Sequence, residues 1–356
     1  MPNDRKLMLV TGAGGFIGGW VAEEAFRHER YRVRAGIRRW TTAARIARFP
    51  MDIALVDVLN MESIDAAMEG VDVVVHCSFG TTDVTVRGTE NMLRAALEHG
   101  VTRFVHLSTI DVYGTPVGDI GEDHPLVMTG SEYGDSKNGA EQKCREFMAR
   151  GLPVTILRPT IVYGPYCKLW VAKFAERLNS GRWGVFAQQG EGWCNLLYVT
   201  DLVDAIFRSI ERDEAVGHAF NISGPETITW NEYFLRFNKQ LGLPPLPVIS
   251  SARSSLSSRV MQPVKRSARF TLQHFQDPIS RLYQRSQFAK SLFKRMEEIM
   301  KATPGPGELG VFSRRTRFPI SKAVALLGYA PSIGPERGIA LSVQWLLHEF
   351  SGARNR

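Results

Sequence analysis

Residues 7–18 read Leu-Met-Leu-Val-Thr-Gly-Ala-Gly-Gly-Phe-Ile-Gly, an apolar run followed by glycines at regular intervals, Gly12, Gly15 and Gly18. The apolar run predicts a strand, and helix-like sequence follows the last glycine. Glycines at a strand-to-helix turn let the backbone approach a pyrophosphate, which the free N–H groups and the dipole of the helix N-terminus attract. A purely structural turn is the alternative, because three glycines alone are a weak signal.

The segments after this turn alternate between strand-like and helix-like patterns. Further strands are expected at residues 31–37, 53–58, 71–76, 103–107 and 154–157. Alternation at this spacing indicates βαβ units, and therefore an α/β fold with a doubly wound parallel sheet. Right-handed crossovers place the carboxyl ends of the strands at one edge of the sheet, where ligands bind. The pattern loosens after Pro159, where a smaller and mostly helical domain is expected.

Length and composition are those of an ordinary globular protein. The 356 residues suffice for about two domains, and the 44% of hydrophobic and 22% of charged residues exclude a wholly disordered chain. No apolar run approaches the roughly 18 residues of a membrane-spanning helix. The four cysteines have neither metal-ligand nor redox-motif spacing. We therefore expect no metal site and a cytoplasmic protein with reduced thiols.

The net charge of +8 is concentrated in one part of the chain. Residues 251–320 carry 14 Lys and Arg against 4 Asp and Glu, a net charge of +10, which leaves −2 for the remainder. Within this segment, residues 279–301 predict a basic amphipathic helix. A solvated surface helix, a protein contact and peripheral attachment to anionic lipid are the alternatives for it. No nucleic-acid partner is expected, because no reader motif accompanies the basic residues.

The end of the second predicted strand bears on the choice of dinucleotide. Folds that bind NAD usually carry an acidic residue there for the ribose 2′-hydroxyl, whereas this chain has Ile37-Arg38-Arg39. A guanidinium matches the geometry of a phosphate, so Arg38 favours NADP, with NAD as the alternative. Asp57 follows the third predicted strand and is expected either at the adenine or on the open surface.

Tyr133 and Lys137 stand four residues apart in a helix-like stretch, which places both on one face. A free tyrosine has a pKa of about 10, too high for a base at neutral pH. A nearby ammonium and a positively charged nicotinamide favour the phenolate, so we expect the pKa of Tyr133 to be lowered. Thr109 follows the strand at 103–107, where its hydroxyl can orient a substrate oxygen. Two surface residues on an amphipathic helix are the alternative interpretation.

Together these pieces resemble the extended short-chain dehydrogenase/reductases, also called the NAD-dependent epimerase/dehydratase family. The resemblance extends over about residues 7–240. Its motifs are Thr11-Gly-Ala-Gly-Gly-Phe-Ile-Gly18, Gly88-Thr-Glu-Asn-Met-Leu93, His106-Leu-Ser-Thr-Ile-Asp-Val-Tyr-Gly114, Tyr133-x-x-x-Lys137, Arg158-Pro-Thr-Ile-Val-Tyr-Gly-Pro165, Tyr198-Val-Thr-Asp201 and Phe220-Asn-Ile-Ser-Gly224. The resemblance implies a Rossmann domain that holds the nicotinamide cofactor and a smaller C-terminal domain that holds the substrate.

The resemblance also implies roles for single residues. It makes Tyr133 the acid/base, Lys137 a contact of the nicotinamide ribose and Thr109 the hydroxyl that orients the substrate. Candidate substrate contacts are Asp111, Tyr163 and Asn195. The residues expected to bind the cofactor are Gly12, Gly15, Phe16, Ile17, Gly18, Arg38, Asp57, Val58, Cys77, Ser78, Tyr133, Lys137, Pro159 and Val162.

Departures from the family pattern bear on the substrate. In many members that act on nucleotide-sugars, an arginine before the Tyr-Val-x-Asp element holds the diphosphate, whereas Asn195 stands near that place here. Asp111 lies where sugar 4,6-dehydratases carry an acidic base. The residue before it, Ile110, replaces a second acidic residue of those enzymes, which favours a structural role for Asp111. The stretch 33–38 looks more like that of the NADP-using reductases of the family.

The domain boundaries follow from the same motifs. Residues 1–165 are expected to form the dinucleotide-binding domain, to which residues 195–224 return. Residues 166–194 and 225–356 are expected to form the substrate domain, with a basic helical insertion at about 245–317. A homodimer is expected, since dimers through a two-helix contact are common in the family.

Three functions are open at this point. The first is an NAD(P)-dependent epimerase or dehydratase, in which a hydride leaves a secondary alcohol of a nucleotide-sugar and later returns. The second is a net NADPH-dependent reductase of a ketone that is not a sugar. The third is a cofactor-binding scaffold without turnover, against which the intact set of Thr109, Tyr133 and Lys137 argues. The resemblance favours the first.

Overall fold

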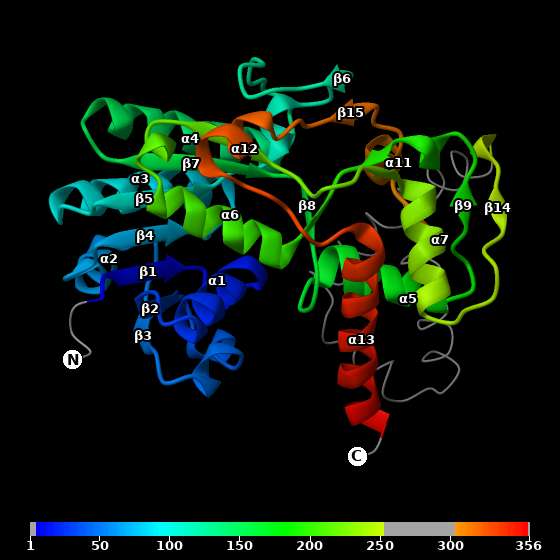
Figure 1. Cartoon of the computed structure of the whole chain (residues 1–356), viewed down its shortest axis with the longest axis horizontal. Coiled ribbons are helices and arrows are strands. Elements are labelled where there is room, and N and C mark those ends of the chain that lie inside the picture. Colours follow the sequence, from blue (N-terminus) through cyan, green and yellow to red (C-terminus); the bar gives the residue numbers. More distant parts are fainter. Residues whose placement is uncertain (1–4, 253–302, 355–356) are drawn as a thin grey trace, which may run out of the picture. The chain divides into compact units, whose positions relative to one another are not determined.

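A computed structural model describes residues 5–252 and 303–354 of the chain and divides them into two compact units (Figure 1). The first unit contains residues 5–163, 195–226 and 316–334, and the second contains the other described residues. The basic helix predicted at 279–301 lies outside the described residues, as does most of the insertion predicted at 245–317.

The first unit is built on a sheet of seven parallel strands (Figure 1). β1, β4 and β7 are buried along their whole length, as expected of apolar runs that are covered on both faces. The order along the sheet reverses between β1 and β4, the kind of place where α/β folds bind ligands. The predicted doubly wound parallel sheet is therefore confirmed. In spatial order the strands are β12 (Ala219–Ile222), β7 (Val154–Pro159), β5 (Arg103–Leu107), β4 (Val73–His76), β1 (Leu7–Thr11), β2 (Arg32–Ile37) and β3 (Asp52–Leu55).

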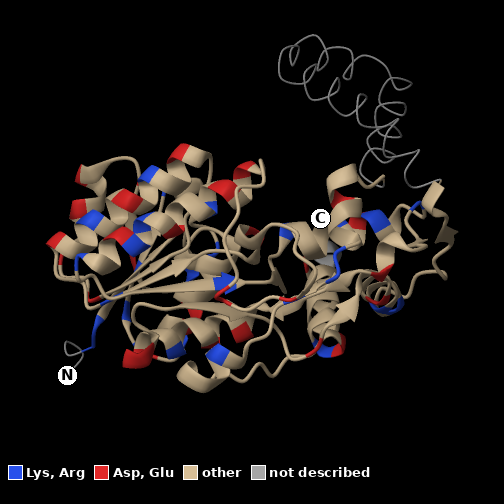
Figure 2. Cartoon of the chain, turned by 90° about the horizontal axis from the view of Figure 1, so that it is seen from above, with Lys and Arg blue, Asp and Glu red and all other residues tan. Residues whose placement is uncertain are grey.

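Helices cover both faces of this sheet. Side chains alternate along β1 and supply two separate cores, since Met8 and Val10 join one and Leu7 and Leu9 the other. Acidic and basic residues are interspersed along the covering helices (Figure 2). The helices are α1 (Phe16–Arg27), α6 (Val199–Glu211) and α12 (Ser321–Leu327) on the first face, and α2 (Met61–Met68), α3 (Thr82–Glu98) and α4 (Glu132–Ala149) on the second.

Two later segments of the chain return to the first unit. β11 (Leu196–Tyr198) leads into α6 and pairs in parallel with β8 (Ile161–Tyr163). Residues 316–334 also belong to this unit, although the sequence predicted them in the second domain. The physical reason is burial, because Ala323 and Leu327 of α12 lie fully buried in the core that α6 shares.

Asp201 ties the last of these segments to α6. Its carboxylate lies in the first turn of α6 and accepts the backbone N–H of Ser332 at 3.1 Å and that of Ile333 at 3.0 Å. The hydroxyl of Ser332 also donates to it, at 3.2 Å. At the other end of the segment, β15 (Thr316–Arg317) pairs with β6 (Gly118–Asp119). The Tyr-Val-x-Asp motif thus has a structural use in this fold.

The second unit is mostly helical and has an aromatic core. Trp230 and Phe312 lie with ring centroids 4.7 Å apart, and Phe234 lies 5.3 Å from Phe312. Short strands pair β9 with β14 and β10 with β13. Its elements are the π-helical turn η4 (Lys168–Ala172), α5 (Lys173–Asn179), β9 (Val185–Phe186), β10 (Trp193–Cys194), β13 (Ile228–Thr229), α7 (Trp230–Gln240), β14 (Val248–Ile249), α11 (Pro306–Phe312) and α13 (Pro335–Arg354).

Within residues 5–252 and 303–354, no helix is both long and apolar enough to cross a membrane. The four cysteines are free thiols. Three of them are buried, and Cys77 is partly exposed just after β4.

Candidate active site

The glycine turn follows β1 at the carboxyl edge of the sheet. Gly12 has a φ of +68°, a left-handed conformation that glycine adopts without strain. A Cβ at Gly18 would lie 2.4 Å from the carbonyl oxygen of Gly12, so the turn admits only glycine there. α1 begins at Phe16, earlier than predicted, and no side chain caps its first turn. The turn therefore offers backbone N–H groups and a close backbone approach, as a pyrophosphate requires.

The ends of β2 and β3 lie at the same edge. Arg38 follows β2 and is exposed, and in the described part of the chain its guanidinium has no ion-pair partner. Asp57 follows β3, and its carboxylate accepts the N–H of Leu59 at 3.0 Å, which shapes the turn into α2. Val58 is buried, and a Cβ at Gly88 of α3 would lie 2.5 Å from it. The side chain of Val58 thus packs in the core.

A chain of hydrogen bonds joins the glycine turn to the end of β4. Thr11 Oγ1 accepts the N–H groups of Cys77 and Ser78 at 3.2 and 3.3 Å and lies 2.9 Å from Nδ1 of His76. His76 Nε2 lies 3.1 Å from the hydroxyl of Thr89, which donates to a backbone carbonyl of α3. His76 must therefore donate from Nε2 and accept at Nδ1. Burial lowers the pKa of His76 to about 3, in keeping with a neutral ring.

Tyr133 and Thr109 meet at the end of β5. Tyr133 lies in the first turn of α4, and its phenol lies close enough to the hydroxyl of Thr109 for that hydroxyl to affect its pKa. Burial and the nearby carboxylate of Asp111 raise the pKa of Tyr133 to about 12, and the hydroxyl of Thr109 opposes that rise. The lowered pKa that the sequence predicted is thus not produced by the side chains of the protein. Tyr133 as a whole residue is 43% exposed, so a ligand can reach its side chain.

Lys137 lies one turn further along α4 and is buried. Its Nζ donates to the carbonyl oxygen of Leu107 at 2.6 Å. Burial lowers the pKa of this amine from 10.5 to about 8. Phe79, in the loop after β4, was not among the predicted site residues. Its ring is 65% exposed, packs edge-to-face on Tyr133 with centroids 6.0 Å apart, and has Lys137 Nζ at 6.0 Å.

The remaining predicted residues are mostly inside the first unit. Pro159 ends β7 and Val162 lies in β8, and both are buried. Tyr163 is buried and packs edge-to-face on Tyr198 with ring centroids 5.5 Å apart. Asn195, a candidate substrate contact, is buried and donates from its amide to the carbonyl oxygen of Thr316 at 3.0 Å. This contact gives Asn195 a structural use, which its position in the motif did not indicate.

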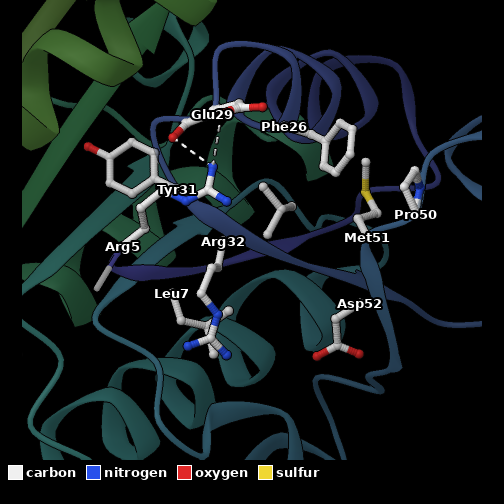
Figure 3. Close-up of a pocket in the computed structure, with 10 residues that line it drawn as sticks. Arg5, Leu7, Phe26, Glu29, Tyr31, Arg32, Pro50, Met51 and Asp52 are labelled. Atoms are coloured by element: carbon white, nitrogen blue, oxygen red, sulfur yellow. Dashed lines mark hydrogen bonds and ion pairs between the residues drawn. The ribbon is translucent and has the colours of Figure 1, made fainter. Parts of the chain in front are cut away.

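A cavity of about 310 Å³ lies at the opposite edge of the sheet, where β1, β2 and β3 begin (Figure 3). Arg5, Tyr31, Arg32 and Asp52 are among its lining residues, and Arg5 donates to the carbonyl oxygen of Glu29 at 3.0 Å. None of the predicted site residues lines this cavity. The candidate site therefore consists of the glycine turn, the residues that follow β2, β3, β4 and β5, and Tyr133 and Lys137 of α4.

Comparison with known families gives one match over most of the first unit. The model of the "NAD dependent epimerase/dehydratase family" matches residues 8–223. UDP-glucose 4-epimerase of Vibrio cholerae is 26% identical over 249 residues, which are 64% of this chain and 75% of that protein. dTDP-D-glucose 4,6-dehydratase of Mus musculus is 33% identical over 174 residues, 46% of this chain and 48% of that protein.

Solved structures show the same fold at low identity. UDP-glucuronic acid 4-epimerase from Bacillus cereus, in complex with NAD, is 19% identical with a TM-score of 0.71, and the match covers 97% of this chain and 99% of that one. UDP-glucose 4-epimerase from Thermotoga maritima, with UDP-glucose, is 21% identical with a TM-score of 0.73 at the same coverage.

Proposed function

Since the chain belongs to the NAD dependent epimerase/dehydratase family, we propose that it is an enzyme that moves a hydride reversibly between a nicotinamide dinucleotide and a secondary alcohol or ketone of a nucleotide-sugar. The observation that carries this proposal is that the phenol of Tyr133 and the hydroxyl of Thr109 lie beside each other, next to the buried amine of Lys137. Relatives named as acting on UDP-glucose and dTDP-glucose support the substrate class.

The residues at the carboxyl edge fit a dinucleotide. The first turn of α1, whose N–H groups no side chain caps, would hold the pyrophosphate together with the glycines of the turn. The absence of a Cβ at Gly18 allows this close turn, because a Cβ there would collide with the backbone of Gly12. Cys77 and Ser78, held by Thr11 at the reversal between β1 and β4, would flank it. Asp57 would lie towards the adenosine end.

Arg38 favours NADP as the dinucleotide. Its guanidinium is exposed, follows β2 and has no ion-pair partner among the described residues, so it is available to a ribose 2′-phosphate. NAD is the alternative, and structures of related fold carry it. The ratio of the two dissociation constants decides between them.

Tyr133 is the acid/base in this proposal. The hydroxyl of Thr109 lies beside the phenol, and the two hydroxyls would orient the substrate oxygen between them. Lys137, whose Nζ donates to the carbonyl oxygen of Leu107, would contact the ribose of the nicotinamide. Its positive charge would lie near the phenol of Tyr133. When bound, an oxidised nicotinamide supplies the hydride acceptor and a positive charge that favours the phenolate. Tyr133 would then take the hydroxyl proton of the substrate and return it.

A second candidate is a net NADPH-dependent reductase of an apolar ketone. The observation that favours it is Phe79, which offers a mostly exposed apolar ring beside Tyr133. Asn195 also favours the reductase, because this buried residue offers no positive charge to the diphosphate of a nucleotide-sugar.

The identity and redox state of the nucleotide retained by the purified protein test the proposal. Mass spectrometry of the denatured supernatant is expected to detect oxidised dinucleotide close to one per chain, and UDP-glucose or dTDP-glucose is then expected to be converted without net consumption of cofactor. An empty protein that consumes NADPH only with apolar ketones would favour the reductase. An empty protein that binds neither dinucleotide would overturn both candidates.

A further inference from the structure

One face of α4 contacts three consecutive residues at the end of β5. Lys137 Nζ donates to the carbonyl oxygen of Leu107 at 2.6 Å, and Glu141 Oε1 accepts the hydroxyl of Ser108 at 2.6 Å. The phenol of Tyr133 lies beside the hydroxyl of the next residue, Thr109. Residues 133, 137 and 141 are four apart and share one helix face. The three contacts therefore fix how α4 lies along the end of β5.

Glu141 is the most firmly held member of this set. Its side chain is fully buried, and Arg158 of β7 binds it with both ends of a fork, Nε to Oε1 at 2.8 Å and Nη2 to Oε2 at 2.7 Å. Arg145 adds a bond to Oε2 at 3.1 Å. β7 lies next to β5 in the sheet. A bidentate pair between buried groups leaves the carboxylate little freedom to turn away from Ser108.

The same arginine holds the chain on the far side of Thr109. Arg158 Nη1 donates to the phenol oxygen of Tyr113 at 2.6 Å, and that phenol donates to Asn221 Oδ1 at 2.8 Å. Tyr113 is the last residue of the 3-10 turn η3 (Ile110–Tyr113), which begins directly after Thr109. Thr109 is thus flanked by two residues, Ser108 and Tyr113, that are both attached to the buried Glu141–Arg158 pair.

We propose that Glu141 and Ser108 are positioning residues that keep the phenol of Tyr133 in register with the hydroxyl of Thr109. This inference rests on the proposed function for its catalytic consequence. A buried ion pair is a poor source of stability compared with apolar packing of equal volume, whereas it holds geometry tightly. The Glu141–Arg158 pair is therefore well suited to fixing a register.

Ser108→Ala is the decisive variant, because it removes one hydroxyl and leaves the ion pair intact. Glu141→Gln is the second variant, and it leaves Arg158 without a charged partner, so its folding has to be checked by melting. Ser209→Ala is the matched control, since Ser209 is a fully buried serine of α6 that donates only to its own helix, at 2.7 Å.

Two measurements are needed on the full chain. Tyrosine labelled with ¹³C at the ring carbon that bears oxygen gives one resonance per tyrosine, and Tyr133→Phe identifies the resonance of Tyr133 among the nine tyrosines. We expect Ser108→Ala to shift this resonance at constant pH and Ser209→Ala to leave it unchanged. We also expect Ser108→Ala to lower kcat about 10- to 100-fold, as for loss of one hydrogen bond to a charged group, with dinucleotide affinity unchanged.

The outcomes separate this inference from the proposed function. An unmoved Tyr133 resonance in Ser108→Ala overturns the positioning role whatever the activity. A shifted resonance with unchanged kcat in Ser108→Ala, when Tyr133→Phe is inactive, overturns its catalytic consequence. A shifted resonance in Ser108→Ala together with full turnover in Tyr133→Phe supports the register and overturns the role of Tyr133 as acid/base.

Discussion

The phenol of Tyr133 lies beside the hydroxyl of Thr109, so a helix that begins at Glu132 and a strand that ends at Leu107 contribute to one site. The two residues are 24 positions apart in the chain. The proposed acid/base chemistry depends on the proximity of Tyr133 and Thr109 in the fold.

Tyr133→Phe is expected to lower kcat about 100- to 10,000-fold, the usual effect of losing a general acid or base. Dinucleotide affinity is expected to stay within about twofold, because the phenol is not needed to hold the pyrophosphate. Tyr31→Phe is the control, since Tyr31 lines the cavity at the opposite edge of the sheet. Turnover assays and equilibrium titration measure both quantities, and full turnover in Tyr133→Phe would show that another group moves the proton.

Gly18→Ala is expected to abolish dinucleotide binding. The added Cβ would lie 2.4 Å from the Gly12 carbonyl oxygen, a backbone atom that cannot move without opening the turn. Gly121→Ala is the matched control, because no atom lies within 4 Å of a Cβ there. Fluorescence titration with both dinucleotides measures the effect. Normal affinity in Gly18→Ala would mean that the turn is structural only.

Arg38→Ala is expected to weaken NADP⁺ binding about 10- to 100-fold and to leave NAD⁺ binding unchanged, as for loss of a charge-assisted hydrogen bond. Arg32→Ala serves as the control, since Arg32 begins the same strand at the other edge. Calorimetric titration of both nucleotides gives the comparison. Wild-type protein that prefers NAD⁺, or equal losses for both nucleotides, would contradict the assignment of Arg38.

Lys137 is expected to make folding stability rise with pH. Its pKa is about 8 in the folded chain and 10.5 as the reference value, so the unfolded chain binds more protons between these limits. From pH 8 to pH 10 the wild type should therefore gain about 2 to 3 kcal/mol relative to Lys137→Met. Urea unfolding of both proteins at the two pH values measures the gain. If the difference in unfolding free energy between the wild type and Lys137→Met were the same at both pH values, the amine of Lys137 would not be desolvated in the folded chain.

Asp201→Ala is expected to lower the free energy of unfolding by about 2 to 4 kcal/mol, because three hydrogen bonds from Ser332 and Ile333 lose their charged acceptor. Asp204→Ala is the control, as its partly exposed carboxylate pairs only with Arg208 in the same helix. Denaturant unfolding compares the two. If Asp201→Ala and Asp204→Ala lowered the free energy of unfolding equally, Asp201 would not anchor residues 332 and 333 to α6.

The sequence could predict the parts of the fold that depend on local pattern. The apolar run 73–75 favours a strand buried on both faces, and the glycines after Leu7–Thr11 favour a turn whose backbone is closely approached. Tyr133 and Lys137 could be paired because helical spacing alone puts them on one face. These predictions do not depend on which residues far apart in the sequence come into contact in the fold.

The features that the sequence did not predict depend on contacts between residues that are far apart in the chain. Glu141 reads in the sequence as one more charged helix residue, and its burial depends on Arg158, which lies on another strand. Phe79 reads as an apolar loop residue, and only the fold brings it onto Tyr133. The pKa of Tyr133 rises because burial and the charge of Asp111 outweigh the effect of the Thr109 hydroxyl, a balance that spacing does not reveal.

The interleaving of the two units has a consequence for biosynthesis. The chain passes from one unit to the other five times, and the last segment of the first unit ends at Gly334. Ala323 and Leu327, which fill part of its core, lie in that segment and are translated after residues 227–315 of the second unit. The first unit therefore cannot complete its core while the ribosome is still adding the preceding residues, and a chain cut after Glu226 would leave that core open. Folding of the first unit is therefore expected to be completed only after residues 316–334 have been translated.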